Sequence, residues 1–358
     1  MKRLPLTVAL LAFFTFLLWS VSVRQSILYL IGIGMGATLA GARFGFTTGW
    51  RQLADSRDPK GSIGQIVLLL VALTLSIPLL ANFPELSAAL GPPSISLLIG
   101  AFIFGMSMQI ADGCGSGSLY KAGMGIPLNV GILPLFAIGS FLGSVQLDQW
   151  LALGQLDPVN LVTVLGATQT VILSWVLLLA TGFGIWWWCN KPAVIFEKRW
   201  VIGGILLAVL ATLNLIVAGQ PWGVVYGFGL WAAKIAYNTG FFDPGSNPFW
   251  SQAGNLEILS QSVLLDVTSI TNIGILSGAL WISSSRNESH KPLTNQQWMI
   301  GLIAGFVMGY SSRLAFGCNI GGMVSGISTG SLHGWIWVPM AFAGTLIGIK
   351  LRKRFGFR

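Results

Sequence analysis

Residues 105–123 read GMSMQIADGCGSGSLYKAG, and residues 309–327 read GYSSRLAFGCNIGGMVSGI. A shift of 204 residues lays the first stretch on the second and superposes Gly113-Cys114 on Gly317-Cys318. Further identities lie on both sides of these dipeptides, at Gly105/Gly309, Ser107/Ser311, Ala111/Ala315 and Gly117/Gly321. The chain therefore carries one cysteine-containing segment twice, which indicates an internal repeat.

A second match, at a shift of 191, lies upstream of each cysteine segment. It pairs residues 32–49, GIGMGATLAGARFGFTTG, with residues 223–240, GVVYGFGLWAAKIAYNTG, and it aligns Arg43 with Lys234. Glycine-rich membrane segments match one another by chance, so either match alone is moderate support. Two matches in the same order favour a duplicated chain.

Composition decides the solvent of this protein. Of the 358 residues, 54% are hydrophobic and only 9% are charged, and the mean hydropathy is +0.75. A soluble domain carries about 25% charged residues, because most of its surface faces water. We therefore predict an all-α, polytopic membrane protein embedded in a lipid bilayer. The net charge of +9 fits the loop rule for membrane proteins better than nucleic-acid binding, for which the sequence shows no pattern.

Apolar segments of near-spanning length recur along the chain. A span needs about 20 apolar residues. The segments cover residues 4–22, 26–45, 64–82, 94–112, 129–147, 166–188, 200–219, 222–241, 263–284, 297–316 and 333–350. We expect about ten transmembrane helices plus re-entrant helices, with the first segment retained as a helix rather than cleaved as a signal peptide.

Lysine and arginine set the expected orientation. Sixteen of the twenty fall near the chain ends or in alternate loops, whereas the connections 82–93, 147–165 and 242–262 contain none. Because basic residues accumulate in cytoplasmic loops, both termini should be cytoplasmic. This leaves residue 199 inside and residues 242–262 outside with two apolar segments between them. Either 200–219 or 222–241 should therefore enter and return without crossing.

These orientations make the two cysteine segments run in opposite directions. We predict an extra N-terminal transmembrane helix at 1–25, a first repeat at 26–188, a second, inverted repeat at 189–350 and a basic cytoplasmic tail at 351–358. Inverted repeats with glycine-interrupted segments are typical of transporters with a site near the bilayer midplane. The alternative is that the glycines only allow close helix packing.

The repeated cysteines are the strongest candidates for chemistry. Glycines beside a cysteine let the backbone bend and expose N–H groups that can hold an anion. A thiol adds a weak donor and a soft acceptor, which suits an anion containing sulfur. The alternative is a pair of inert, buried cysteines. The predicted substrate-binding residues of these segments are Gly113, Cys114, Gly115, Gly317, Cys318 and Asn319.

Three basic residues, Arg43, Lys234 and Arg313, fall within apolar segments. Charges at membrane depth are costly and usually mark a pathway or a pair, so Arg43 and Lys234 are predicted to attract an anion. The alternative is that both reach the interface. Asp112, two residues before Cys114, disfavours a thiolate and favours a neutral thiol. Cys189 has no counterpart in the repeat and is interpreted as structural.

No catalytic triad, zinc motif, phosphate loop or cofactor fingerprint is present. We therefore expect a protein that is not an enzyme, with no catalytic residues, no metal and no cofactor. Asp266, Thr268 and Asn272 form a polar stripe, for which bonds between helices are favoured over a place on the substrate path.

Together, residues 43–51 (RFGFTTGWR), Gly113-Cys114 and Gly317-Cys318 resemble the YeeE/YedE family of bacterial inner-membrane sulfur transporters. The likeness covers about residues 26–350. It implies an hourglass-shaped bundle with re-entrant helices meeting centrally, thiosulfate as substrate, and a cytoplasmic TusA-like sulfur-carrier protein as partner. In that family a third cysteine follows an Arg-Phe pair, whereas this sequence has Gly45. A different sulfur anion, or a relay modified around Thr47 and Thr48, stays open.

The leading hypothesis is a multi-pass inner-membrane transporter that passes thiosulfate or a related sulfur anion along thiol groups at the membrane centre. The alternative is a membrane sulfur-transfer protein that carries sulfur covalently on Cys114 or Cys318 to a cytoplasmic carrier. A scaffold subunit without a substrate path is disfavoured by the paired Gly-Cys sites.

Overall fold

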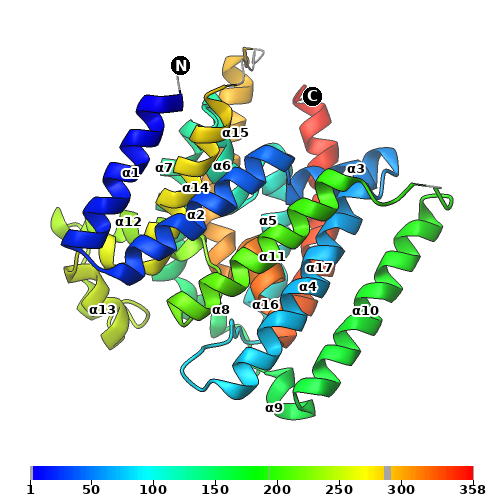
Figure 1. Ribbon diagram of the computed structural model, residues 1–358, viewed down its shortest axis with the longest axis horizontal. Coiled ribbons are helices and arrows are strands. Elements are labelled where there is room, and N and C mark those ends of the chain that lie inside the picture. The colour runs from blue at the N-terminus through cyan, green and yellow to red at the C-terminus, as the bar shows by residue number, and fades with distance from the viewer. Residues whose placement is uncertain (1–2, 193, 286–291, 358) are drawn as a thin grey trace.

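A computed structural model describes residues 3–192, 194–285 and 292–357, and within these ranges the regular structure is helical (Figure 1). Two isolated β-bridges, Ser94 to Gln155 and Asn160 to Ser331, join loops at one end of the bundle. The long helices are α1 (Arg3–Ser20), α2 (Val23–Ala42), α4 (Lys60–Asn82), α5 (Ile95–Ile110), α7 (Pro127–Val145), α10 (Ala167–Trp188), α11 (Lys198–Ala218), α14 (Val267–Ser283), α15 (Asn295–Leu314) and α17 (Leu332–Arg354).

Shorter helices connect or interrupt the long ones. Those that carry the site are α3 (Phe46–Ser56), α6 (Gly115–Gly123), α12 (Val225–Asn238), the π-helical segment η3 (Asn319–Ser325) and α16 (Gly326–Ser328). Those at the surface are α8 (Leu147–Leu151), α9 (Leu161–Leu165), η1 (Pro244–Ser246), α13 (Ala253–Ser260) and η2 (Val263–Leu265). The all-α prediction is confirmed, and each of the eleven apolar segments contains a helix.

The exterior of the bundle is apolar, as a protein in lipid requires. In the part of the chain that the structure describes, nine helical segments are long and apolar enough to cross a bilayer, and α14, with 17 residues, is slightly shorter. The peripheral helices α1 and α10 expose large side chains such as Trp19 and Phe183, whereas buried positions elsewhere include many serines and asparagines. The protein is therefore a polytopic membrane protein.

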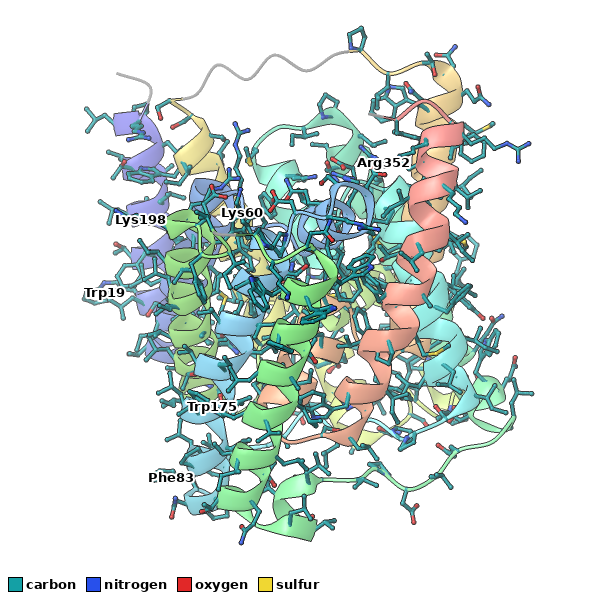
Figure 2. The ribbon with its side chains drawn as sticks, turned by 90° about the vertical axis from the view of Figure 1, so that its right-hand side faces the viewer. Trp19, Lys60, Phe83, Trp175, Lys198 and Arg352 are labelled. Atoms are coloured by element: carbon teal, nitrogen blue, oxygen red, sulfur yellow. The ribbon has the colours of Figure 1, made fainter. Side chains whose placement is uncertain are left out.

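The two ends of the bundle differ in charge. Lys60, Lys198 and Arg352 lie toward the end at which both chain termini are found, and Phe83 lies at the other end (Figure 2). We call the first end the terminal face. The helix α12 has 14 residues and is about 21 Å long, too short for a hydrocarbon core of about 30 Å. The sequence predicted that 200–219 or 222–241 does not cross, and the short helix is the second of these.

The helices pack in reciprocal pairs. Helix α2 packs on α14 and α4 on α11, while α5 packs on α17 and α7 on α15. If α2 to α7 are matched in order with α11 to α17, each contact has its counterpart in the other half. Ser96 at the start of α5 donates to the carbonyl of Leu314 at the end of α15, at 2.9 Å, so these matched helices run in opposite directions. This is the arrangement expected of an inverted repeat.

The same matching corrects the second sequence alignment. Contacts and chain order match α12 with α3, whereas the shift of 191 lays the end of α2 on α12. Arg43 and Lys234 therefore do not occupy equivalent positions. Glycine-rich helices match one another too easily to fix this register.

Repeated glycines mark the helix crossings. A methyl group on Gly105 would lie 1.9 Å from the carbonyl oxygen of Ala341, and one on Gly309 would lie 2.1 Å from that of Phe136. Only glycine allows backbones to approach this closely. For this repeat pair, close packing explains the conservation of glycine between the two halves.

Candidate functional site

Both cysteine segments begin with the same turn. Helices α5 and α15 each end one residue before an alanine, and the next residue, Asp112 or Phe316, has a left-handed backbone with φ of 55° or 56°. The N–H of Gly113 then bonds to the carbonyl of Met108 at 3.1 Å, and that of Gly317 to the carbonyl of Ser312 at 2.8 Å. These bonds close each helix with a Schellman turn and aim the chain back into the bundle.

This turn places each cysteine at the start of a short helix. The sulfur of Cys114 accepts the N–H of Gly117 at 3.4 Å and lies 3.4 Å from the hydroxyl of Ser116. The sulfur of Cys318 accepts the N–H of Ile320, also at 3.4 Å. Both cysteines are free and fully buried. The sulfur atoms thus cap α6 and η3, as oxygen-bearing residues usually do.

The two cysteine segments touch. Helix α6 contacts η3, and a methyl group on Gly115 would come within 3.1 Å of the Cys318 sulfur and 3.4 Å of the Phe136 ring. The absence of a side chain at Gly115 therefore makes room for the sulfur of the other half. The prediction that the repeat brings its two Gly-Cys sites together agrees with this geometry.

Two further short helices begin next to the short helices that follow the cysteines. Ser325, in η3, donates to the carbonyl of Trp222 at 2.6 Å, so α12 begins next to η3. A methyl group on Gly45 would lie 3.6 Å from the hydroxyl of Tyr120, so α3 begins next to α6. Helix N-termini carry partial positive charge and unpaired N–H groups, so the meeting of the starts of α6 and η3 at Gly115 and Cys318 favours an anion.

Asn319 adds an amide to the centre. It is fully buried, and within the described chain neither its side-chain oxygen nor its nitrogen has a hydrogen-bond partner. Thr47, at the start of α3, has a buried hydroxyl in the same condition. Buried polar groups are almost always bonded in native proteins. These two therefore lie where a ligand or water would complete them.

Gly45 and Arg43 lie in the turn between α2 and α3. Gly45 is the residue before the first turn of α3, is buried, and has an ordinary φ of −108°. A side chain there would point at the hydroxyls of Thr48, 3.0 Å from its Cβ, and Tyr120. Arg43 ends α2 in a left-handed conformation and is exposed. It therefore lies outside the buried thiol centre.

Lys234 has a different surrounding from the one the sequence suggested. Its ammonium group donates to the carbonyls of Leu259 at 2.9 Å and Gln261 at 2.5 Å, and also to that of Ile258. These carbonyls close the C-terminus of α13, where a cation is stabilising. All three N–H donors of Lys234 are thus bonded to carbonyls at the C-terminal end of α13.

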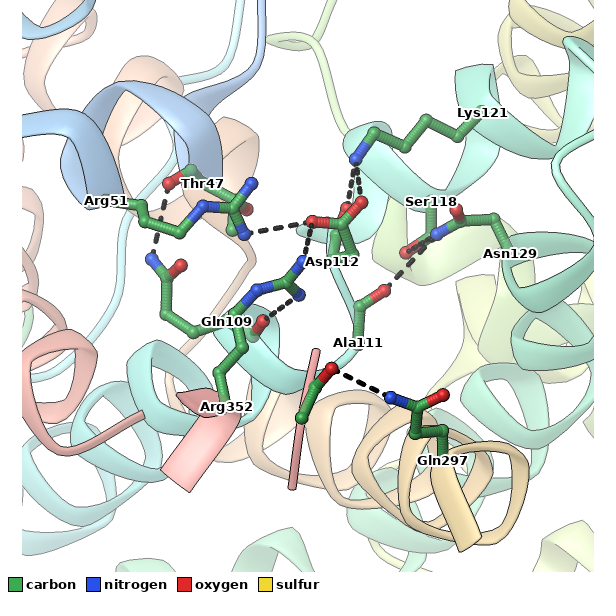
Figure 3. Close-up of polar contacts among 11 residues, drawn as sticks. Thr47, Arg51, Gln109, Ala111, Asp112, Ser118, Lys121, Asn129, Gln297 and Arg352 are labelled. Atoms are coloured by element: carbon green, nitrogen blue, oxygen red, sulfur yellow. Dashed lines mark hydrogen bonds and ion pairs between the residues drawn. The ribbon is translucent and has the colours of Figure 1, made fainter. Parts of the chain in front are cut away.

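A cluster that sequence reasoning missed lies beside Cys114. The carboxylate of Asp112 pairs with Lys121 at 2.7 Å, Arg51 at 2.9 Å and Arg352 at 3.2 Å (Figure 3). These cations come from α6, α3 and α17. The sequence assigned Arg51 and Lys121 to loops and Arg352 to the C-terminal tail, all on one side of the membrane, and that shared side was the only signal that they could meet.

A cavity of about 630 Å³ adjoins this cluster at the terminal face. Its polar lining is Asp112, Arg352, Asn129 and Gln297. Asn129 donates to the carbonyl of Ala111 at 3.3 Å and to the hydroxyl of Ser118 at 3.4 Å, which holds the Asp112 turn against α6 (Figure 3). We call this space the terminal cavity.

The other polar residues noted in the sequence have local roles. Asp266 caps α14 by accepting the N–H of Ser269 at 2.7 Å, and Asn272 donates to the carbonyl of Val224 at 2.9 Å. Bonds of this kind were the favoured interpretation of the polar stripe. Cys189 ends α10, and burial raises the pKa of its thiol. In residues 3–192, 194–285 and 292–357, no three His, Cys, Asp or Glu side chains form a metal-binding group.

Known proteins resemble this chain over most of its length. A family model described as sulphur transport matches residues 41–347. A thiosulfate transporter TsuA of Spirochaeta thermophila is 26% identical over 331 residues, which are 86% of this chain and 92% of the relative. A thiosulfate transporter TsuA of Escherichia coli is 21% identical over 87% of this chain and 90% of its own length. The chain also shares 25% identity over 169 residues with the probable transporter YedE of Escherichia coli, covering 37% of that protein. With the family match extending through both Gly-Cys segments, the chain belongs to the sulphur transport family.

Proposed function

We propose that this protein transports thiosulfate, or a closely related sulfur anion, across a bacterial cytoplasmic membrane. The single observation that carries the proposal is the contact between two cysteine segments, Cys114 on α6 and Cys318 on η3, at converging helix N-termini. The names of the two full-length relatives support thiosulfate as the anion.

The geometry supports passage by non-covalent contacts. N–H groups at the starts of α6 and η3 attract the charge of the anion, and the neutral thiols of Cys114 and Cys318 donate weak S–H bonds to its soft sulfur atom. Gly113, Gly115 and Gly317 bend the backbone and leave space, and Asn319 adds an amide. Each contact is weak, and a site that binds weakly also releases its ion.

Two predicted residues receive different roles in this proposal. Arg43, exposed at the end of α2, attracts anions toward the thiols. Lys234 secures α13 and is left outside the path, because its three donors are already bonded. Gly45 leaves the hydroxyls of Thr48 and Tyr120 as the hydrogen-bonding groups at the position where the family that the sequence resembles has a thiol.

The orientation of the protein in the membrane follows from the charges. Basic side chains at the terminal face make that face cytoplasmic, so both termini lie inside the cell. A TusA-like carrier docking at this face would receive the sulfur without reaching the buried cysteines. The protein then acts as a transporter and not as an enzyme, and residues 26–188 and 189–350 form its two inverted halves.

Uptake of labelled thiosulfate into liposomes that contain only this protein tests the proposal. We expect uptake by the unchanged protein, and a loss of about tenfold in Cys114→Ala and in Cys318→Ala, since each removes a weak contact of the path. Cys189→Ala is the matched control and should transport normally. Sulfite, sulfate and selenium analogues in the same assay rank the substrates.

Two results would count against the mechanism. Normal uptake by both Cys114→Ala and Cys318→Ala would remove the thiols from it. A persulfide trapped on either cysteine, together with no uptake in the absence of a carrier protein, would favour covalent sulfur transfer instead.

A further inference from the structure

Arg313 is a charged residue within an apolar segment, near the end of α15. It is half-buried, and its backbone carbonyl accepts the N–H of Phe316 at 3.2 Å in the turn that leads to Cys318. A charge at membrane depth is costly, and it marks either an ion pair or a pathway. The surroundings of the guanidinium group decide between these two roles.

The described chain supplies no negative group to Arg313. Its guanidinium carbon lies 4.8 Å from the ring centroid of Phe249 and 5.8 Å from that of Tyr226. Among the described residues Arg313 has no ion pair and no hydrogen bond from its side chain, and its Nε is buried without a partner. Aromatic ring faces attract a cation without using its N–H donors. The guanidinium is thus held in place with its donors available.

Arg313 lies on the side of the bundle away from the terminal face. Helix α15 begins at the terminal face, where Gln297 donates to the carbonyl of Gly356 at 2.9 Å, and Arg313 is near the other end of this 20-residue helix, which is about 30 Å long. Phe249 belongs to the connection 242–262, which contains no Lys or Arg. The charge pattern predicts that this connection faces the outside of the cell, where uptake begins.

Two other cations on this side are bonded to the ends of helices. Arg24 donates to the carbonyls of Val217 at 2.9 Å and Ala218 at 2.6 Å, at the end of α11. Lys234 donates to three carbonyls at the end of α13. Arg313 differs from both, because its side-chain N–H groups are not bonded within the described chain. It can therefore offer them to an anion that arrives from this side.

Arg313 is also close to the cysteine segment of its own half. Cys318 follows it after the Schellman turn, and Tyr226 belongs to α12, which begins beside η3 through the bond from Ser325 to the carbonyl of Trp222. The ring of Tyr226, which holds the guanidinium, therefore comes from a helix that touches the helix begun by Cys318. An anion bound by Arg313 has a short way to the first thiol.

We propose that Arg313 binds the oxygen atoms of the anion on the outer side, before the sulfur atom of the anion reaches Cys318. This inference rests on the transport function proposed above. A guanidinium presents parallel N–H donors in one plane, which match two oxygen atoms of an oxyanion. Arg313 thus selects for a sulfur oxyanion, whose oxygen atoms suit the guanidinium and whose terminal sulfur suits the thiol. Phe249 and Tyr226 position the guanidinium without neutralising it.

Arg313→Gln tests this role in the liposome uptake assay. We expect the KM for thiosulfate to rise about tenfold and the maximal rate to stay unchanged, because a charge-assisted binding contact is lost and the thiols remain. Arg313→Lys keeps the charge but not the planar pair of donors, so its KM should lie between the two. The matched control is Arg24→Gln, which removes another arginine of the same side and should leave the KM unchanged.

Equilibrium binding of thiosulfate to the purified protein supplies a second readout, and it should weaken about tenfold in Arg313→Gln. If Arg313 only stabilises the outer loop, the substitution will lower the thermal unfolding temperature and leave the KM and the binding constant unchanged, which would overturn the proposal. Arg313→Lys serves if the glutamine variant does not fold, and an unchanged KM in it would contradict the pairing with two oxygen atoms.

These outcomes are separable from the main function. If the unchanged protein transports no thiosulfate, the transport proposal fails. If the unchanged protein transports thiosulfate and Arg313→Gln has the same KM, only the role of Arg313 is refuted.

Discussion

At the scale of single residues, Gly115 sets how closely the two cysteine segments can approach. Cys318 belongs to the other half of the chain, yet its sulfur lies 3.1 Å from the position that a Cβ on Gly115 would take. The two halves thus pack closely at Gly115, because this residue has no side chain. A cysteine alone does not make this site, because the glycine that follows it decides how near the partner sulfur can come.

Gly115→Ala should therefore impair transport while the fold persists. The added methyl group would lie 3.1 Å from the Cys318 sulfur, so the two segments must separate slightly. We expect thiosulfate uptake to fall about tenfold, which corresponds to ~1.4 kcal/mol. The matched control is Gly41→Ala at the end of α2, where no atom lies within 4 Å of the new methyl group. Equal uptake by the two variants would show that the separation does not matter.

At the scale of elements, glycine contacts fix how closely helices α5 and α17, and helices α15 and α7, can pack. Gly105 and Gly309 hold matching places in the two halves and meet the backbones of α17 and α7. The short helices α6 and η3 follow α5 and α15 directly. The position of each thiol therefore depends on how closely its long helix approaches a neighbour.

Gly105→Ala should lower stability before it alters chemistry. Its methyl group would overlap the Ala341 carbonyl, and overpacking of this kind costs about 1–3 kcal/mol. We expect a lower thermal unfolding temperature in detergent and less protein in membranes. Gly309→Ala should behave alike, because it overlaps the Phe136 carbonyl. The added methyl group of Gly184→Ala on α10 meets nothing within 4 Å, so this variant should unfold at the same temperature as the unchanged protein. An unshifted unfolding temperature for Gly105→Ala would refute the packing argument.

Several of these elements could be predicted from sequence. A run of apolar residues predicts a long helix without knowledge of its neighbours, so α1 to α17 were foreseen wherever they approach spanning length. Cys114 and Cys318 were foreseen because a repeat places equal residues in equal surroundings. The Asp112 cluster was not, since Arg51, Lys121 and Arg352 come from three elements, and only packing brings them together. The surroundings of Lys234 were not predicted, because its partners are backbone carbonyls, which leave no mark in the sequence.

At the scale of the whole molecule, the bundle has a closed centre and peripheral helices. Helix α10 contributes few buried residues, and an apolar cavity of about 570 Å³ lies between it and the bundle, lined by Trp50, Leu178, Trp188, Met323 and Phe342 among others. The thiols are fully buried and the charged cluster lies at the terminal face. An anion that passes between the two faces of the bundle would therefore meet the thiols in the interior and the charged cluster at the terminal face.

The orientation of this order can be checked in intact cells. In a protein with Cys114, Cys189 and Cys318 replaced by alanine, Ser87→Cys places a thiol in the loop after α4, and Ser56→Cys places one at the terminal face. Both positions are exposed. We expect a membrane-impermeant maleimide to label the first from outside and the second only after the cells are permeabilised. The reverse labelling would invert the topology.

The turn shared by the two halves has the same backbone but different side chains, which bears on the proposed transport of the anion. Its left-handed residue is Asp112 in one half and Phe316 in the other. The ring centroid of Phe316 lies 6.4 Å from that of His333. The backbone is thus repeated while the chemistry is not, because the two halves place different side chains at the same point of the turn. Fixed side chains cannot create net movement without a gradient. The difference between the two halves therefore does not by itself drive the anion in one direction.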